Sequence, residues 1–316
     1  MGKYSVIVEI MESVEQVLYS VISVIIVLQM IISSRKVVYL LRQLSLFDVK
    51  AKSTFKQPKI KTTNSKIYRF IIISGVVLVI LAVLKHGVFF YFVNPITTII
   101  FLYNVRGLVA LIIYSLVLIE FSALAFTLKQ KFELINKFLL SLNFQLKSGH
   151  NCNEVTQKVK FVSQIYNHLC DLSKILCQIF SVPIIFLTFA QVLILISAIF
   201  SLVEFGFVNE GPVESPGSVG QDFADILIYF TLTFLLISSS SKTMNEARKT
   251  AILAHLLIAD NHLSQELHFT VVNFSLQLAH NDVRFTACNF FAIDESLIRS
   301  FEFDVKKHHK NKLQVQ

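Results

Sequence analysis

The chain has 316 residues, of which 54% are hydrophobic and 16% are charged, and its mean hydropathy is +0.62. A soluble domain usually carries about 25% charged residues, so this composition excludes an ordinary soluble protein and predicts a multi-pass membrane protein. The formal net charge of +8 does not indicate a nucleic-acid partner, because the basic residues lie between apolar runs, where they set membrane orientation.

Five apolar runs are candidates to cross a hydrocarbon core of about 30 Å. Pro183 lies in the inner third of the fourth run and predicts a kink or a locally re-satisfied backbone there. Together the runs predict an all-α fold, a multi-pass transmembrane helical bundle that forms a single receptor domain over 1–316. The runs occupy residues 14–32, 70–93, 96–126, 175–203 and 223–239.

The charges between the runs orient this bundle. Residues 33–69 hold ten Lys or Arg and a single acid, Asp48, so the positive-inside rule places them in the cytoplasm. A polybasic patch for anionic lipid or nucleic acid is the alternative for this segment, although it lacks the interleaved aromatic residues of a nucleic-acid binder. Residues 127–174 are also basic, whereas residues 204–222 contain no Lys or Arg and fit an outside location.

This alternation predicts an external N-terminus and a cytoplasmic C-terminus. Long cytoplasmic helices are expected at 241–298, followed by a basic tail at 299–316. Apolar residues recur there at steps of three and four, which lays them on one helix face. The two stripes are Met244, Ala247, Ala251, Ala254 and Ile258, and then Leu263, Leu267, Val271, Phe274 and Leu278.

The order of residues within 274–298, FSLQLAHNDVRFTACNFFAIDESLI, is more specific than its periodicity. An apolar-Gln-apolar-x-His turn leads into Phe-Thr-Ala-Cys-x-Phe-Phe-x-Ile-Asp and then Glu-Ser-Leu. This resembles the stretch just before the last membrane span of insect gustatory receptors. Residues 129–136, KQKFELIN, are similar to a cytoplasmic loop of the same family. Asn289 stands where the family usually has Gly.

The resemblance implies seven spans, and removing the first and the last of them gives the orientation derived above from charge. After residue 298 the chain does not continue into Thr-Tyr, five apolar residues and Gln-Phe, with which the family's last span opens. We therefore expect a copy that lacks the first and last spans and conducts poorly or not at all by itself.

The resemblance also implies a function at the plasma membrane, that of a gustatory chemoreceptor. Such receptors resemble ligand-gated cation channels built as homo- or hetero-tetramers, which detect an external small-molecule tastant. The alternatives are a non-conducting partner that modulates complete receptors and a small-molecule transporter. The implied coupling motif, packed around the central axis, comprises Gln277, His280, Phe285, Thr286, Phe290, Phe291 and Asp294.

Polar side chains within the spans are the candidates for the ligand pocket, because they are expensive in hydrocarbon and usually face a cavity or a partner. Arg106 is the deepest charge, and Asp225 is a candidate counter-charge for it. Snorkelling toward the interface is the alternative for Lys85 and Asp225. The predicted ligand-binding residues, all in the external half, are Lys85, His86, Tyr103, Arg106, Gln191, Asp225 and Tyr229.

The sequence offers no enzyme signature. It contains no Gly-x-Ser-x-Gly, no phosphate-cradling glycine-rich loop and no His-Glu-x-x-His. The four cysteines form no Cys-x-x-Cys pair and lack metal-ligand spacing, and their cytoplasmic locations predict free thiols. We therefore predict no catalytic site, no metal and no cofactor.

Overall fold

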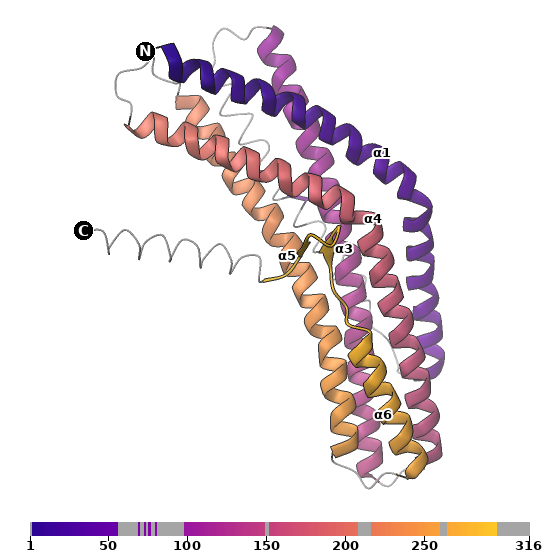
Figure 1. Cartoon of the computed structure of the whole chain (residues 1–316). Coiled ribbons are helices and arrows are strands. Elements are labelled where there is room, and N and C mark those ends of the chain that lie inside the picture. Colours follow the sequence, from indigo (N-terminus) through magenta and orange to yellow (C-terminus); the bar gives the residue numbers. More distant parts are fainter. Residues whose placement is uncertain are drawn as a thin grey trace, which may run out of the picture. The chain divides into compact units, whose positions relative to one another are not determined.

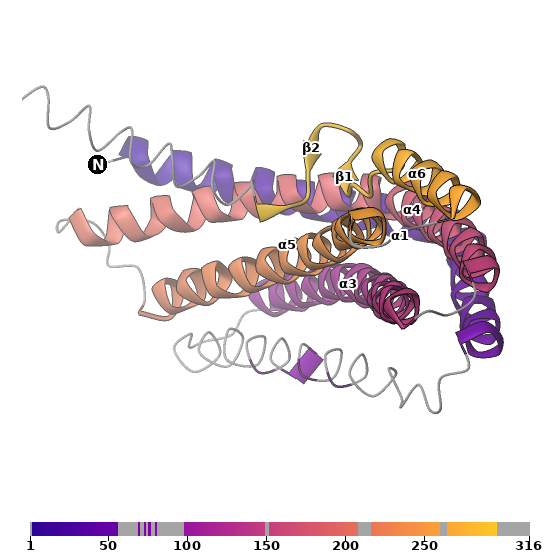
Figure 2. The same cartoon turned by 90° about the horizontal axis from the view of Figure 1, so that it is seen from below.

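The computed structural model describes residues 2–55, 69, 73, 75–76, 80, 98–148, 152–207, 216–259 and 264–295. Long helices make up most of this part of the chain, and one short antiparallel hairpin follows them (Figures 1 and 2). The elements are α1 (Gly2–Phe55), α3 (Thr98–Lys147), α4 (Cys152–Phe207), α5 (Pro216–Ala259), α6 (Gln265–His280), β1 (Thr286–Ala287) and β2 (Phe291–Ala292).

Within the described residues, four helices are long and apolar enough to cross a membrane. They overlap four of the five predicted runs. The predicted span at 70–93 falls almost wholly outside the described residues. The four stretches are Ser20–Ala51, Val105–Lys147, Cys152–Ile199 and Phe223–Ile258.

The helices extend well beyond the predicted spans. Segment 33–69, which lies between two predicted spans, is helical as far as Phe55, and 127–174 is helical up to Lys147 and again from Cys152. The sequence gives the reason, because apolar residues at steps of three and four continue past each span and are buried. In α1 these residues are Leu40, Leu44, Phe47 and Ala51.

The chain divides into two compact units, and α1, α3, α4 and α5 each contribute a part to both. Unit 1 comprises Met1–Ser33, Tyr68–Phe121 and Ser181–Leu236. Unit 2 comprises Ser34–Ile67, Ser122–Phe180 and Ile237–Gln316. The single receptor domain expected for the whole chain stays a prediction.

Unit 1 has a buried apolar face on each helix and an exposed apolar face opposite. Tyr114 and Phe121 are almost fully buried in α3, whereas Leu116 between them is 61% exposed. On α5, Leu232 is buried and Phe230 is 69% exposed. Exposed apolar faces of this extent suit helices surrounded by lipid rather than by water.

Unit 2 is a helical bundle whose core residues alternate at steps of three and four. This spacing is that of helices packed side by side with knobs in holes. In α5 the seam consists largely of small residues, which allow close approach of the neighbouring backbone. The buried residues are Ala125, Leu128, Phe132, Ile135, Leu139 and Leu142 in α3, Val155, Val159, Val162, Tyr166 and Leu169 in α4, and Ser240, Thr243, Ala247, Thr250, Ala254 and Leu257 in α5.

The second predicted stripe forms α6 and is buried at Leu267, Val271, Phe274 and Leu278, whereas Leu263 lies outside the described residues. Ser264 caps the helix, since its hydroxyl accepts a hydrogen bond from the Leu267 amide at 3.4 Å. The expectation of helix as far as residue 298 is wrong, because α6 ends at His280 and an extended segment follows.

Candidate functional site

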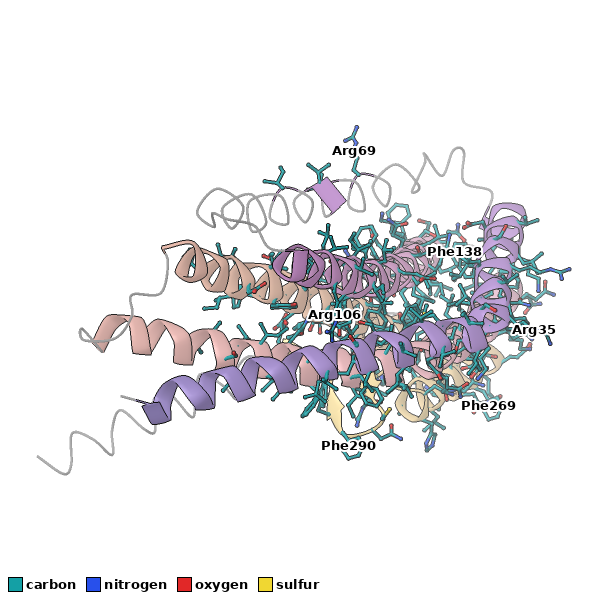
Figure 3. The ribbon with its side chains drawn as sticks, turned by 90° about the horizontal axis from the view of Figure 1, so that it is seen from above. Arg35, Arg69, Arg106, Phe138, Phe269 and Phe290 are labelled. Atoms are coloured by element: carbon teal, nitrogen blue, oxygen red, sulfur yellow. The ribbon has the colours of Figure 1, made fainter. Side chains whose placement is uncertain are left out.

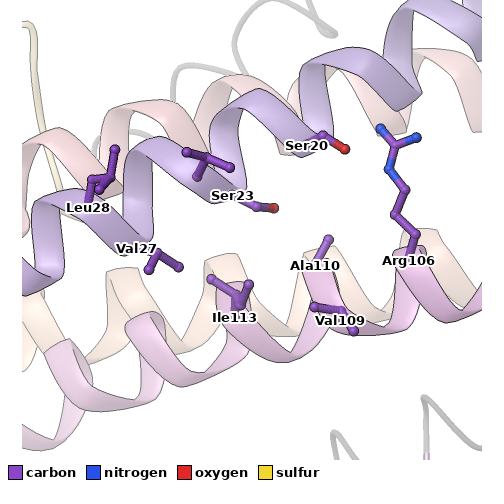
Figure 4. A pocket seen from close by; sticks show the side chains of 9 residues that line it. Ser20, Ser23, Val27, Leu28, Arg106, Val109, Ala110 and Ile113 are labelled. Carbon is purple, nitrogen blue, oxygen red and sulfur yellow. The ribbon is translucent and has the colours of Figure 1, made fainter.

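Unit 1 contains a pocket of about 450 Å³ between α1 and α3 (Figure 4). This volume lies within the range of small-molecule sites. Its walls are mostly aliphatic. The lining residues are Ser20, Ser23, Val24, Val27 and Leu28 of α1 and Arg106, Val109, Ala110 and Ile113 of α3.

The pocket is polar at one end and apolar at the other. Arg106 reaches from α3 toward α1 near Ser20, whereas Leu28 lies at the opposite end (Figure 4). Ser23 also lines the pocket and donates a hydrogen bond to the buried hydroxyl of Tyr114 at 3.5 Å. This bond ties α1 to α3 behind the pocket wall.

A second polar cluster in unit 1 joins α4 to α5. The Thr233 hydroxyl lies 3.1 Å from Oε1 of Gln191, to which it donates, and 2.9 Å from the backbone oxygen of Tyr229. Gln191 is 4% exposed, and its Nε2 has no hydrogen-bond partner among the described residues. A buried amide N–H with no partner is costly, so this atom is a candidate contact for water or a ligand.

The predicted ligand residues therefore do not all lie in one place. Arg106 lines the α1–α3 pocket, Gln191 and Tyr229 are buried near the α4–α5 cluster, and Asp225 is half-buried on α5. Tyr103 lies in α3, although its side chain is outside the description, and Lys85 and His86 lie outside the described residues altogether. No carboxylate of the described residues, Asp225 included, is within ion-pair distance of Arg106.

Unit 2 contains the second candidate site, the segment that follows α6. We call residues 281–295 the coupling hairpin. Thr286 pairs with Ala292 and Ala287 with Phe291, and the Ile293 amide donates to the Phe285 oxygen at 2.8 Å. Four buried side chains anchor this segment, since Val283, Phe285, Ala287 and Ile293 are at most 2% exposed.

The turn of the hairpin explains one departure from the family pattern. Cys288 and Asn289 have φ values of 49° and 61°, in the left-handed region. Glycine adopts this region without cost, and asparagine tolerates it better than most other residues. The Thr286 hydroxyl also donates to Oδ1 of Asn289 at 3.1 Å. Asn289 therefore stands in a position that needs a positive φ, which accounts for the usual glycine.

A row of polar side chains on α4 holds α6 and the coupling hairpin. Ser163 and Asn167 both donate to Oε1 of Gln277, the latter at 3.4 Å. Asn281, at the end of α6, donates through Nδ2 to Oδ1 of Asn167 at 3.0 Å. Tyr166, between the two α4 residues, packs edge-on against Phe274 with ring centroids 6.1 Å apart.

Two thiols continue this row along α4. Cys170 donates to the backbone oxygen of Asn281 at 3.6 Å, and Cys177 to that of Arg284 at 3.4 Å. Both cysteines are free. We call Ser163, Asn167, Cys170 and Cys177 the α4 polar row.

The residues of the predicted coupling motif lie in different environments. Gln277 contacts the α4 polar row, Phe285 is fully buried, and Thr286 and Phe291 form the paired strands. Phe290, at the hairpin tip, is 80% exposed and points away from the bundle (Figure 3). His280 and Asp294, exposed and half-buried respectively, complete the motif.

Sequence reasoning missed the α4 polar row and the extended shape of the hairpin. A signal for the hairpin was present, since apolar Val283, Phe285 and Ala287 alternate with polar Arg284 and Thr286, as in a half-buried strand. The α4 polar row carries a weaker signal. Its spacing of four, three and seven places it on one helix face, but polar residues on a helix face are most often solvated.

A buried polar network lies nearby between α3 and α5. Nδ2 of Asn136 donates to Oε1 of Glu246 at 3.0 Å and to its backbone oxygen at 2.9 Å. The Thr250 hydroxyl donates to Oδ1 of Asn136 at 2.7 Å, and Lys249 pairs with Glu246 at 2.9 Å. Asn136 and neighbouring Phe132 and Ile135 belong to 129–136, the segment similar to a cytoplasmic loop of the family, and they are buried in the core of α3.

Comparison with known proteins adds independent information. Residues 1–301 match the family described as 7tm Chemosensory receptor. The chain is 30% identical over 151 residues to the Putative gustatory receptor 28a of Drosophila melanogaster, which covers 44% of this chain and 31% of that protein. It is 27% identical over 148 residues to the Gustatory receptor for bitter taste 66a of the same organism, covering 46% and 28%. The matches thus span less than a third of each relative.

Solved structures share the fold at low sequence identity. The insect olfactory receptor OR5 from Machilis hrabei superposes with a TM-score of 0.69 at 14% identity, covering 98% of this chain and 82% of that one. The same receptor in complex with eugenol gives a TM-score of 0.67 at 15% identity, covering 96% and 82%. At these identities the likeness concerns the fold.

Proposed function

Because the chain belongs to the 7tm chemosensory receptor family, a family of multi-pass membrane receptors rather than enzymes, we propose that it is a subunit of a taste receptor for external small molecules. It acts as part of a ligand-gated cation channel in the plasma membrane. The observation that carries this proposal is the family match over residues 1–301, which contains both candidate sites.

The α1–α3 pocket is the proposed ligand site. It combines an apolar wall with a few polar groups at one end, which is the composition of most small-molecule sites. Charge between the spans supports an outward location for this end, since residues 204–222 lack Lys and Arg whereas 33–69 are strongly basic. Gln191 is not among the residues that line this pocket, and its unpartnered amide in the α4–α5 cluster is a separate candidate contact.

The coupling hairpin is the proposed link to the gate, on the cytoplasmic side. α4 supports this role because one continuous helix carries both the α4 polar row and Gln191.

Assembly as a homo- or hetero-tetramer is part of the proposal. Three apolar side chains are exposed here: Phe290 at the hairpin tip is 80% exposed, and Phe269 and Leu276 on α6 are 66% and 55% exposed. The two phenylalanines point outward (Figure 3). Apolar side chains this exposed outside the predicted spans are typical of subunit contacts.

Whole-cell recording with a tastant panel tests the proposed function. The chain is expressed alone and together with a second gustatory receptor subunit, with surface labelling as the expression control. A ligand-evoked cation current that depends on this chain, or a change in the partner's current, supports a receptor subunit. Uptake of a labelled tastant by cells expressing this chain alone, with no current in either setting, would instead favour a transporter.

A further inference from the structure

Arg106 needs a negative partner that the described residues do not supply. It lies in the outer part of an apolar span, where an ionised side chain is expensive unless it is paired or faces a cavity. No described carboxylate lies within ion-pair distance of it, and its guanidinium stands at the end of the α1–α3 pocket (Figure 4). The pocket therefore offers an anionic group a place to bind beside Arg106.

The rest of the pocket is aliphatic and favours a ligand whose remaining part is apolar. Val24, Val27 and Leu28 of α1 face Ala110 and Ile113 of α3 along its length. From Ser20 to Leu28 the α1 wall rises through eight residue steps, which is about 12 Å at the rise of an α-helix. Such a wall stabilises a ligand chain or ring by removing its apolar surface from water.

We propose that this pocket binds an apolar small molecule with an anionic head, a carboxylate or a phosphate. The head pairs with Arg106 beside Ser20, and the tail lies among the aliphatic side chains toward Leu28. The planar guanidinium donates two parallel hydrogen bonds to either oxyanion. This assignment deepens the proposed function and rests on it, because it names the ligand class of the proposed receptor site.

Two sources can supply this chemistry, an external organic acid and an anionic membrane lipid. The chain is purified in nanodiscs of neutral phosphatidylcholine, and the affinities for octanoate and for octanol are measured. The two probes share an apolar tail and differ in the charge of the head. In a second arm, phosphatidylglycerol is mixed into the discs, and the lipid retained by the protein is identified by native mass spectrometry.

We expect octanoate or phosphatidylglycerol to bind, and Arg106→Gln to weaken that binding at least tenfold while octanol binding changes little. Arg106→Lys keeps the charge and restores part of the affinity. Gly107→Ala is the matched control, because an added Cβ there meets nothing within 4 Å. Octanoate binding in neutral discs identifies the external acid, and Arg106-dependent retention of phosphatidylglycerol alone identifies the lipid.

Three results would overturn the assignment: equal affinity for octanoate and octanol without Arg106-dependent retention of phosphatidylglycerol, an Arg106→Gln protein that binds the anion as before, or no binding of either anion. Val27→Phe provides a second test in case the Arg106 variant misfolds, because the larger side chain fills the apolar end of the pocket and leaves Arg106 unchanged. It should weaken octanoate and octanol alike. Since binding is measured without current, anion binding in a chain that never affects a current would refute the proposed function and leave this inference standing.

Discussion

Asn281, which caps the C-terminal end of α6, donates a hydrogen bond to Asn167 of α4 at 3.0 Å. The same Asn167 donates to Gln277 one turn earlier in α6. A single α4 side chain therefore fixes both the last turn of α6 and the start of the coupling hairpin. Side-chain bonds from α4 and the buried apolar side chains of the hairpin therefore set its position more than strand pairing does, since the pairing involves only two residue pairs.

Replacing Asn167 by alanine should loosen the coupling hairpin without unfolding the bundle. The change removes both bonds and costs about 1 kcal/mol of local stability, which corresponds to about fivefold faster amide exchange. Hydrogen exchange followed by mass spectrometry over residues 281–295 measures it. Gln164→Ala is the control, because Gln164 is exposed on the same helix. Equal exchange in both variants would show that the α4 polar row does not hold the hairpin.

The turn residue Asn289 offers a test of backbone conformation. Asn289→Gly should leave stability unchanged or slightly higher, because glycine adopts the observed φ of 61° freely. Asn289→Val should destabilise the hairpin by about 1–2 kcal/mol, since a β-branched residue is strained there. Exchange rates at Phe290 and Ile293, whose amides bond within the hairpin, report the difference. A valine variant as well protected as the glycine variant would contradict a positive φ.

The buried network between α3 and α5 should matter more than any surface ion pair. Asn136→Ala leaves the Glu246 carboxylate without one of its donors and should cost about 2 kcal/mol of unfolding free energy. Lys137→Ala breaks an exposed pair with Glu133 and should cost less than about 0.5 kcal/mol. Denaturant titration in detergent compares the two. Similar losses for both variants would mean that the network adds no stability.

The contribution of the Cys170 thiol to stability depends on pH. Burial is the main cause that raises its pKa from 9.0 to about 12. The folded chain therefore keeps a proton that the unfolded chain loses above pH 9, so this group's contribution to stability is complete below pH 9 and is lost as the pH rises toward 12. Between pH 7 and 9, iodoacetamide should leave Cys170 unmodified in the folded protein and label it after denaturation. Rapid labelling of the folded protein would contradict the burial.

The helices could be predicted from the sequence, whereas the coupling hairpin could not, and each outcome has a physical reason. Apolar runs must be helical in lipid, because every backbone group has to be satisfied internally. Helical spacing continues through Phe274 and Leu278, so the pattern up to His280 favoured helix. The switch to alternation at Val283 is only five residues long, which is too short to outweigh the helical pattern before it.

Single residues of the candidate site could be predicted from the sequence, but which of them lie together in space could not. Arg106 stood out because a charge within an apolar run is costly. Nothing in the order of residues indicates that α1 supplies Ser20 and Ser23 opposite it, since that contact joins segments more than eighty residues apart. The pairing of Gln191 with Thr233 likewise depends on how α4 packs against α5.

The measurement that tests the receptor account most directly is the tastant-evoked cation current in cells expressing this chain with a second gustatory receptor subunit. The account predicts a current that depends on the chain. It also predicts that Asn167→Ala alters gating whereas Gln164→Ala does not, at equal surface expression. If no tastant changes the current in the presence of the chain, and both variants behave as the unmodified chain does, the proposed receptor function is contradicted.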